Sequence, residues 1–358
     1  MGTIYDSVND LKEMLFGEQH DNFDNMRQKI EKNLETGQVD IPPQYLMMKV
    51  TNLCNSDCIY CNHAKSRAQT EVKEQIPLEQ MIKIIDEAAR LGVKAISISG
   101  GEPLLRPDIE NMIVRIVEHG IVPVLLTNGC FLGERVEKLY ESGLKYFIIS
   151  LDSLDEKDYL YQRGVEINKV LEGIEALRKI KEKDENVKIH ITPVVTAKNI
   201  LQMPQLVEYF SERGIAVQFS PYHKFTYFQR DVLVEFVRKE VEEVIDKLVE
   251  QKKAGLMIAN SVSFLKHFKK FMCEGKILPD EYECLAGFST IYVDTYENVL
   301  PCWSGGFGPI GNLKQESLVD IWYSEKYSEI RRKMKKCQCP GCWLLCTGEL
   351  TMLIQGKN

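Results

Sequence analysis

Short apolar runs alternate, between residues 45 and 222, with segments whose apolar residues recur every three or four positions. The short runs predict buried strands and the recurring pattern predicts helices. Strands are expected at 45–50, 95–98, 122–126, 146–149, 187–191 and 216–219. Because strands that alternate with helices form parallel βαβ units, this pattern predicts an α/β fold built as a barrel or partial barrel.

The alternation stops near residue 224. Residues 229–253 and 261–272 follow as two amphipathic, highly charged segments that predict helices, and a cysteine-rich tail poor in strands comes last. The expected organisation is a helical preface, a barrel core, a helical connector and a small tail domain, at residues 1–44, 45–224, 225–274 and 275–358.

Composition and charge narrow the class of protein. Of the 358 residues 44% are hydrophobic and 27% charged, as in a packed globular chain, and the net charge of −7 provides no field that attracts nucleic acid. No apolar run approaches the roughly 20 residues that span a bilayer. The first residues are acidic, unlike a secretion signal. We therefore expect a cytoplasmic protein with no nucleic-acid or membrane partner.

Eleven cysteines are the strongest chemical signal in the sequence. In a reducing compartment, clustered thiols bind metal or perform redox chemistry more often than they form disulfides. Cys130 and Cys273 stand alone, whereas the others form two groups, at Cys54, Cys58 and Cys61 and at Cys284, Cys302, Cys337, Cys339, Cys342 and Cys346. Two separate metal-binding regions are predicted.

The first group, Cys54-x₃-Cys58-x₂-Cys61, directly follows the first predicted strand. Three thiolates on a short loop can hold three irons of a [4Fe–4S] cluster and leave the fourth iron open to another ligand. A zinc site with His63 as fourth ligand is the alternative. The cysteines alone leave both interpretations open.

The surrounding residues distinguish these interpretations. Tyr60 precedes the last cysteine of the group, and polar or glycine-rich turns follow the next strands: Gly100-Gly101-Glu102-Pro103, Thr127-Asn128-Gly129, Ser150-Leu151-Asp152 and Arg163-Gly164. In this arrangement, residues 45 to about 222 resemble the radical SAM superfamily. The resemblance implies a partial (β/α)₆ barrel and a [4Fe–4S] cluster whose open iron binds S-adenosylmethionine. It also implies a reductant such as flavodoxin or ferredoxin, and a 5′-deoxyadenosyl radical that removes a hydrogen atom from substrate.

The resemblance assigns roles around S-adenosylmethionine. Gly100, Gly101 and Glu102 are expected near its ammonium group, and Arg163 at its carboxylate. Ser150 and Asp152 suit the ribose hydroxyls. The expected neighbours of adenine are Tyr60, Val194 and Phe219, although ordinary barrel packing also explains Val194 and Phe219, and a helix cap also explains Asp152.

The tail resembles the SPASM/twitch extension of radical SAM enzymes. The resemblance is carried by Cys284-Leu-Ala-Gly287, Pro301-Cys302-Trp303 and Gly311-Asn-Leu313. It implies one or two auxiliary [4Fe–4S] clusters. Because the two-cluster pattern has seven or more cysteines and this tail has six, one cluster is expected, on Cys284, Cys302 and two of Cys339, Cys342 and Cys346, with Cys337 as the spare thiol. A zinc knuckle is the alternative. Asn298 stands where the family usually has glycine, and asparagine tolerates a positive φ.

Three further features carry weaker expectations. The basic run 331–336 is expected to be the solvated end of a helix rather than a nucleic-acid patch. Cys130 and Cys273 are either buried thiols or hydrogen-atom donors to a substrate radical. Tyr222, His223 and Lys224, just past the sixth strand, are candidate lining residues of the barrel.

The substrate is expected to be a peptide or protein that undergoes dehydrogenation, cross-linking or epimerisation, by analogy with relatives that carry this tail. The preface of about 44 residues is shorter than the peptide-recognition domain of many such relatives. Oxidation or epimerisation of a sugar or aminocyclitol is therefore the alternative, and a non-catalytic zinc or iron–sulfur scaffold is the remote one. The chain ends Gln-Gly-Lys-Asn rather than in the Gly-Gly of molybdenum-cofactor cyclases, so a different reaction is expected.

Overall fold

The computed structural model describes residues 20–61, 76–223, 233–277, 282–303, 306–336, 338–339 and 341–356. Six parallel strands form the core sheet, in the order β1-β2-β3-β4-β5-β7. Their bounds are Tyr45–Thr51, Ala95–Gly100, Val122–Thr127, Tyr146–Ile149, Lys188–Ile191 and Ala216–Val217. The predicted partial barrel and its six strands are confirmed.

The sixth strand is shorter than predicted because the chain changes partner. Beyond Val217 it continues as β8 (Ser220–Pro221), which pairs in parallel with β6 (Val194–Val195) in a separate two-stranded sheet. This change of partner carries the chain across the carboxyl end of the barrel, near the loops that follow the other strands.

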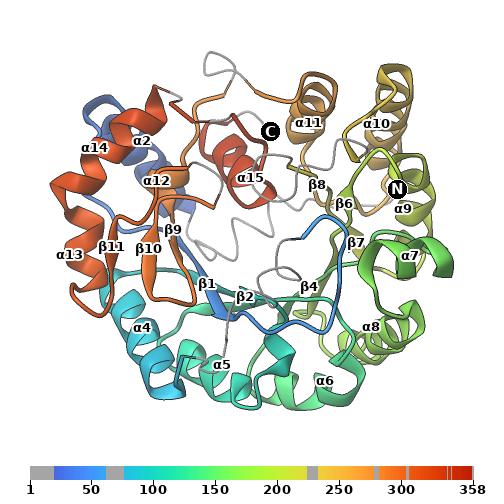
Figure 1. Ribbon diagram of the computed structural model, residues 1–358, viewed down its shortest axis with the longest axis horizontal. Helices are drawn as coiled ribbons and strands as arrows, with labels where there is room; N and C mark the ends of the chain where they lie inside the picture. Colours follow the sequence, from blue (N-terminus) through green and yellow to red (C-terminus); the bar gives the residue numbers. More distant parts are fainter. Residues whose placement is uncertain are drawn as a thin grey trace.

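Helices cover the outer face of the barrel sheet (Figure 1). The helices of this layer are α4 (Leu78–Leu91), α5 (Ile109–Glu118), α6 (Leu132–Glu141), α7 (Glu156–Arg163), α8 (Ile167–Lys181) and α9 (Met203–Ser211), with the 3₁₀ turns η1 (Pro103–Leu105) and η2 (Ile200–Gln202). The core lies between the two layers, where Leu46, Met48, Ile96, Ile98 and Leu125 are fully buried. The remaining strand residues alternate toward the barrel interior, as the pleat of a strand requires.

The tail extends the barrel sheet. Its first strand, β9 (Thr290–Val293), pairs in parallel with β1 and is followed by antiparallel β10 (Asn298–Leu300) and β11 (Gly311–Asn312). The tail helices are α12 (Ala286–Ser289), α13 (Leu318–Tyr323), α14 (Glu325–Lys335) and α15 (Leu345–Ile354). In Figure 1, α15 lies over the barrel strands, between the tail strands and α11. Strand β1 therefore has a neighbour on both sides.

The helices of the preface and connector are α2 (His20–Thr36), α10 (Arg238–Lys253) and α11 (Val262–Glu274). Helix α10 begins later than the predicted residue 229. Residues 234–237 precede it without helical structure, and the buried Leu233 before them accepts the backbone N–H of Ala197 on its carbonyl at 2.9 Å. Residues 1–19 of the predicted preface lie outside the described residues.

Arg331 corrects the interpretation of the basic run as solvated. Its side chain is fully buried, and its guanidinium donates from Nε to the Gly287 carbonyl at 2.6 Å and from Nη2 to the Trp322 carbonyl at 2.8 Å. The guanidinium carbon also lies 3.7 Å from the centre of the Tyr327 ring. Arg331 therefore joins α12, α13 and α14 inside the tail, and burial lowers its pKa to about 10.

The expectation of a positive φ at Asn298 is wrong. Among the described non-glycine residues only Glu297 has a positive φ, of 65°, and Asn298 begins β10. The reason is the turn before this strand, in which the Asp294 carboxylate accepts the N–H groups of Tyr296 and Asn298 at 2.8 and 2.9 Å. These contacts place the left-handed residue one position earlier.

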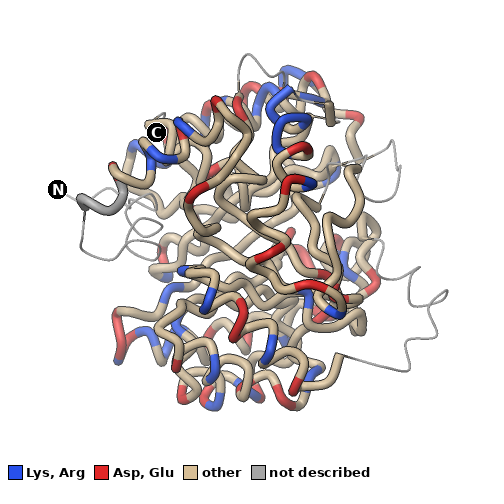
Figure 2. The backbone as a smooth tube through the Cα atoms, turned by 90° about the vertical axis from the view of Figure 1, so that its left-hand side faces the viewer, with Lys and Arg blue, Asp and Glu red and all other residues tan. Residues whose placement is uncertain are grey.

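Lys and Arg positions are interspersed with Asp and Glu positions along the backbone (Figure 2). Within the described part of the chain, no helix is long and apolar enough to cross a membrane.

Replacing Arg331 by Met keeps most of the side-chain volume but leaves the Gly287 and Trp322 carbonyls without their donors. Loss of these buried, charge-assisted hydrogen bonds is expected to lower the free energy of unfolding by about 2–4 kcal/mol, measured by urea titration. Arg332→Met is the control, because Arg332 pairs with Glu325 at the surface and its loss is expected to cost less than about 1 kcal/mol. Equal losses in the two variants would contradict the structural role of Arg331.

Candidate active site and its two cysteine groups

The loop that carries Cys54, Cys58 and Cys61 begins where β1 ends, and the turn after β2 holds its first part. The N–H of Gly101 donates to the Thr51 carbonyl at 2.8 Å, and the N–H of Glu102 donates to the Leu53 carbonyl at 2.7 Å. These two bonds continue the β1–β2 pairing past the strand ends. They fix the backbone that enters the cysteine loop.

This pairing leaves no room for side chains at the two glycines. A Cβ at Gly100 would lie 2.3 Å from the Thr51 carbonyl oxygen, and one at Gly101 would lie 2.1 Å from the Leu53 carbonyl oxygen. Gly100 also has a φ of 141°, which other residues rarely adopt. The glycines of the Gly-Gly-Glu-Pro turn are therefore required by the close approach of the cysteine loop.

The end of α7 supports the loop from a second direction. The N–H groups of Asp57 and Ile59 each donate at 3.0 Å, to the carbonyls of Arg163 and Gln162 respectively. Gly164 ends α7 in the left-handed conformation, with a φ of 68°. The expected Arg163-Gly164 element thus lies directly against the cysteine loop.

The turn after β3 supports the loop from a third direction. The Asn128 amide donates to the Asn55 side chain at 2.8 Å and to the Ser56 hydroxyl at 2.9 Å. Sequence reasoning did not assign roles to Asn55 and Ser56. Asn55 and Ser56 lie between the candidate ligands Cys54 and Cys58 in the sequence, but this position did not indicate which residue they contact.

Glu102 organises this turn from within. Its buried carboxylate accepts the Leu104 N–H at 3.0 Å, the Thr127 hydroxyl at 2.7 Å and the Asn128 N–H at 2.7 Å. Burial raises the pKa of Glu102, although these hydrogen bonds oppose the shift. Glu102 therefore links the turns after β2 and β3.

A buried network connects four of the predicted cofactor-binding residues. Asp152 accepts the Nε and Nη2 groups of Arg163 at 2.7 and 2.9 Å, the Val194 N–H at 2.8 Å and the Tyr60 hydroxyl. The guanidinium carbon of Arg163 lies 5.4 Å from the centre of the Tyr60 ring. Ser150 is half-buried at the end of β4 beside this network. The structure thus gathers these residues where the cysteine loop lies.

Other expected lining residues take structural positions. Phe219 is fully buried in the main core, and its N–H donates to the Asn260 side chain at 2.6 Å. His223 is buried and its Nε2 accepts the Trp343 N–H at 3.2 Å. Burial lowers the pKa of His223 to about 3. Tyr222 is buried beside Tyr60, and Lys224 lies outside the described residues.

The three loop cysteines are the candidate metal ligands of this loop. Burial raises the pKa of the Cys58 thiol to about 12, although Arg163 opposes this, and Cys61 and Cys54 raise it further. Iron binding deprotonates such thiols, and a cluster holds its thiolates farther apart than one ion does. Among the described side chains, no group of three or more His, Cys, Asp or Glu residues is arranged around a single metal ion. His63, the zinc alternative's fourth ligand, is not among those residues.

Four tail cysteines interact electrostatically. Cys342 and Cys302 act on the buried thiol of Cys284, and Cys302 acts on that of Cys346. The Tyr292 hydroxyl lies 3.8 Å from the Cys346 sulfur. No such contact involves Cys339 within the described residues, and Cys337 lies outside them. We therefore propose Cys284, Cys302, Cys342 and Cys346 as the ligands of the auxiliary cluster.

Lys49 lies between the two cysteine groups, which the sequence did not reveal. It is on β1, its Nζ is 4.3 Å from the centre of the Trp303 ring, and Trp303 follows Cys302. Burial lowers the pKa of Lys49, and the charges of Cys61 and Asp294 oppose this shift. The positive charge of Lys49 therefore stabilises the thiolate of Cys61 electrostatically.

The two lone cysteines lie in different surroundings. Cys130 follows the turn after β3, and its thiol hydrogen-bonds to Asn55 and interacts with the charge of Cys54. Cys273 is on α11, and the charges that act on it come from Arg238, Glu242, Glu274 and Lys269 of α10 and α11. The structure brings Cys130, and not Cys273, to the cysteine loop.

Comparisons with known proteins agree with this geometry. Residues 48–210 match the family model of the radical SAM superfamily, and residues 284–343 match that of the SPASM iron–sulfur cluster-binding domain. The chain therefore belongs to the radical SAM superfamily and carries a C-terminal SPASM domain. These domains imply a [4Fe–4S] cluster that binds S-adenosylmethionine and an auxiliary iron–sulfur cluster.

Individual relatives differ in what they share with the chain. A GTP 3′,8-cyclase from Aliarcobacter butzleri is 35% identical over 181 residues, 49% of this chain and 54% of the cyclase. The match thus spans about half of that relative's length. An AdoMet-dependent heme synthase from Methanosarcina barkeri is 26% identical over 310 residues, 82% of this chain and 85% of the synthase. SuiB of Streptococcus suis, bound to the precursor peptide SuiA, has a similar fold, with a TM-score of 0.64 and 21% identity. The match covers 86% of this chain and 70% of SuiB.

Replacing Gly101 by Ala is expected to displace the cysteine loop, because the new Cβ would lie 2.1 Å from the Leu53 carbonyl oxygen. Iron per reconstituted chain should fall by about four, the content of one [4Fe–4S] cluster. Gly133→Ala is the matched control, since its Cβ would meet nothing closer than 3.7 Å. Full iron content in Gly101→Ala would show that the cysteine loop does not depend on the close approach of Gly101 to the Leu53 carbonyl.

Replacing Cys342 by Ser is expected to remove the auxiliary cluster, about four irons per chain, because it removes one of the four gathered thiols. Cys339→Ser should leave the iron content unchanged. Iron analysis and the visible absorption of the reconstituted variants measure both effects. Loss of iron in Cys339→Ser, with retention in Cys342→Ser, would show that the donor set is different.

Proposed function

We propose that this chain is an S-adenosylmethionine-dependent radical enzyme that removes a hydrogen atom from a carbon of a peptide or protein substrate. A [4Fe–4S] cluster on Cys54, Cys58 and Cys61 would supply the electron that splits S-adenosylmethionine into methionine and a 5′-deoxyadenosyl radical. The observation that carries the proposal is the convergence of the turns after β2 and β3 and the end of α7 on one cysteine loop.

The buried network assigns roles to the residues around the cofactor. Tyr60 and Val194 would flank adenine, and Ser150 and Asp152 would face the ribose. Because Nε and Nη2 of Arg163 already donate to Asp152, Nη1 of Arg163 would bind the methionine carboxylate. The turn at Gly100, Gly101 and Glu102 would lie at the ammonium group. Asp152 thereby orients both Tyr60 and Arg163.

The peptide substrate is supported by two observations. SuiB, whose fold is similar, contains a precursor peptide in its structure. The barrel interior also holds a cavity lined mainly by apolar side chains, which suits one amino-acid side chain better than a sugar with many hydroxyl groups. Dehydrogenation, cross-linking and epimerisation all begin with the same hydrogen-atom removal, and Cys130 would return a hydrogen atom in the last case.

A small-molecule substrate is the second candidate. The heme synthase from Methanosarcina barkeri aligns over most of both chains, which is the observation that favours it. The oxidation of a sugar or aminocyclitol belongs to the same class, and hydrogen-bonding side chains such as Lys188, His190 and Gln218 also line the cavity.

Reduced, reconstituted protein with S-adenosylmethionine is expected to release 5′-deoxyadenosine and methionine. Cys58→Ala should lower this rate by about a hundredfold or more, because the variant cannot hold the cluster that supplies the electron. Cys273→Ala, at a half-buried position of α11, should leave it within about twofold. Chromatography of the quenched reaction measures both products. Undiminished cleavage in Cys58→Ala would refute the assignment.

A further inference from the structure

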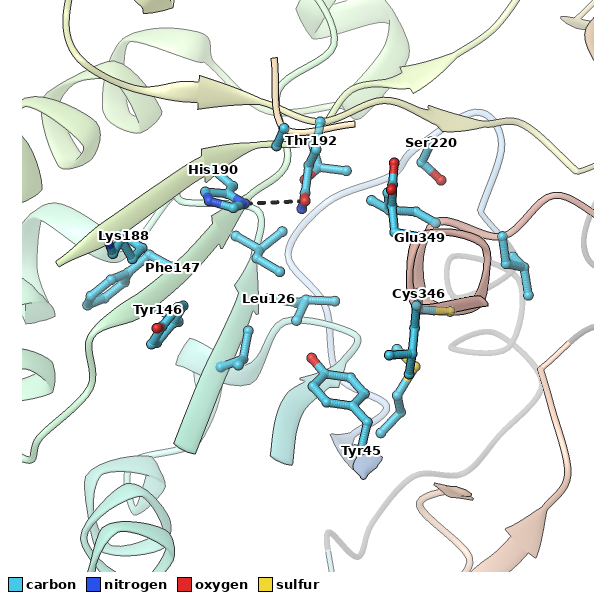
Figure 3. Close-up of a pocket in the computed structure, with 18 of the residues that line it drawn as sticks. Tyr45, Leu126, Tyr146, Phe147, Lys188, His190, Thr192, Ser220, Cys346 and Glu349 are labelled. Atoms are coloured by element: carbon cyan, nitrogen blue, oxygen red, sulfur yellow. Dashed lines mark hydrogen bonds between the residues drawn. The ribbon is translucent and has the colours of Figure 1, made fainter. Parts of the chain in front are cut away.

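A cavity of about 310 Å³ lies inside the barrel, between the strands and helix α15 (Figure 3). Two rows of paired strand residues form one wall, Val124–Tyr146–Lys188 and Leu126–Ile148–His190. Helix α15 forms the facing wall with Cys346, Glu349, Leu350 and Leu353. This volume accommodates on the order of ten water molecules, at the small end of ligand sites.

Hydrogen-bonding and apolar side chains both line the cavity, and the hydrogen-bonding ones include Lys188, Tyr45 and Tyr146. Figure 3 shows His190, Thr192, Ser220 and Glu349 along its upper part, with Tyr45, Leu126, Tyr146 and Phe147 below. On the strand side, Gln218 donates to the Thr192 hydroxyl at 2.8 Å and its amide oxygen lies 3.3 Å from His190 Nδ1. These polar strand residues therefore bond to one another across the wall.

Glu349 is the single carboxylate among the described residues that line the cavity. Its Oε1 accepts the Ser261 N–H at 2.9 Å, and its side chain also hydrogen-bonds to Asn260. No Lys, Arg or His among the residues described forms an ion pair with Glu349. The charge of Lys252 acts on Glu349, but the Lys252 Nζ donates to the Ile258 carbonyl at 2.7 Å. Burial raises the pKa of Glu349 to about 7, and hydrogen bonds from Ser261 and Asn260 and the charge of Lys252 oppose this shift.

We propose that this cavity binds a short apolar chain that ends in an ammonium or guanidinium head, and that Glu349 receives this head. The inference rests on the proposed function, since it names the class of substrate for the same barrel. An apolar wall stabilises the chain by burial, and a cation supplies the counter-charge that the carboxylate lacks. A neutral sugar carries no charge that would pair with the Glu349 carboxylate.

The position of Glu349 also relates the cavity to the auxiliary cluster. Glu349 lies three residues after Cys346, so both side chains are on the same face of α15. Both residues line the cavity. A substrate group bound at Glu349 would therefore lie beside a ligand of the auxiliary cluster.

Calorimetric titration of the reconstituted protein with hexylamine, hexan-1-ol and hexanoate tests the proposal, because the three probes share one chain length and differ in the head. Hexylamine is expected to bind at least about tenfold more tightly than the other two. Glu349→Gln should remove that tenfold preference and leave hexan-1-ol unchanged. Glu329→Gln, on the exposed face of α14, is the matched control. Equal binding of all three probes, or unchanged hexylamine binding in Glu349→Gln, would overturn the proposal.

Two further measurements keep the outcome decisive. If Glu349→Gln does not fold, Leu126→Phe is the substitute variant, because the larger side chain narrows the cavity from the strand side. Leu126→Phe should weaken the binding of hexylamine about tenfold and leave the binding of methylamine unchanged. Equal loss of binding for the two amines would overturn the proposal. Gly-Lys-Gly beside hexylamine distinguishes a head carried by a peptide from a free amine. If the protein releases 5′-deoxyadenosine from S-adenosylmethionine but does not bind hexylamine preferentially, only this inference is refuted. If it releases no 5′-deoxyadenosine, the proposed function is refuted.

Discussion

The close approach of two backbone segments is the constraint on which the site depends. The turn at Gly100-Gly101 lies so near the chain leaving β1 that neither position has room for a Cβ. That approach permits the hydrogen bonds from Gly101 and Glu102 that hold the cysteine loop. From Glu102 the support continues to Thr127 and Asn128, and from Asn128 back to the loop. The cysteine loop is therefore held by neighbouring turns, each positioned by its own strand.

Strand β1 connects the two metal-binding regions. On one side it pairs with β2, whose turn holds the cysteine loop, and on the other with β9 of the SPASM domain. Lys49 projects from β1 toward Trp303, and the charge of Cys61 acts on it. Helix α15 adds a second connection, since it carries Cys346 and also walls the barrel cavity. The auxiliary region is thus part of the barrel's interior surface.

Local patterns in the sequence predicted the elements, and contacts between distant residues decided the rest. The six strands and the loop cysteines could be predicted because apolar runs and Cys spacing are visible within short windows. The burial of Arg331 could not, because its partners Gly287 and Trp322 are remote or lie in another helix. Likewise, the polar pattern marked Asp152 and Arg163 but did not show that they pair with each other. The path of α15 across the barrel has no local signature, so the cavity and Glu349 emerged only from the fold.

Electron paramagnetic resonance of the reduced, reconstituted protein, with and without S-adenosylmethionine, tests the central claim most directly. Two cluster signals are expected, and S-adenosylmethionine should change one of them, because only the loop cluster has an iron without a cysteine ligand. In a Cys54/Cys58/Cys61→Ala variant the remaining signal should not respond to S-adenosylmethionine. A response in that variant, or no response in the unaltered protein, would contradict the assignment of the cysteine loop as the site of radical generation.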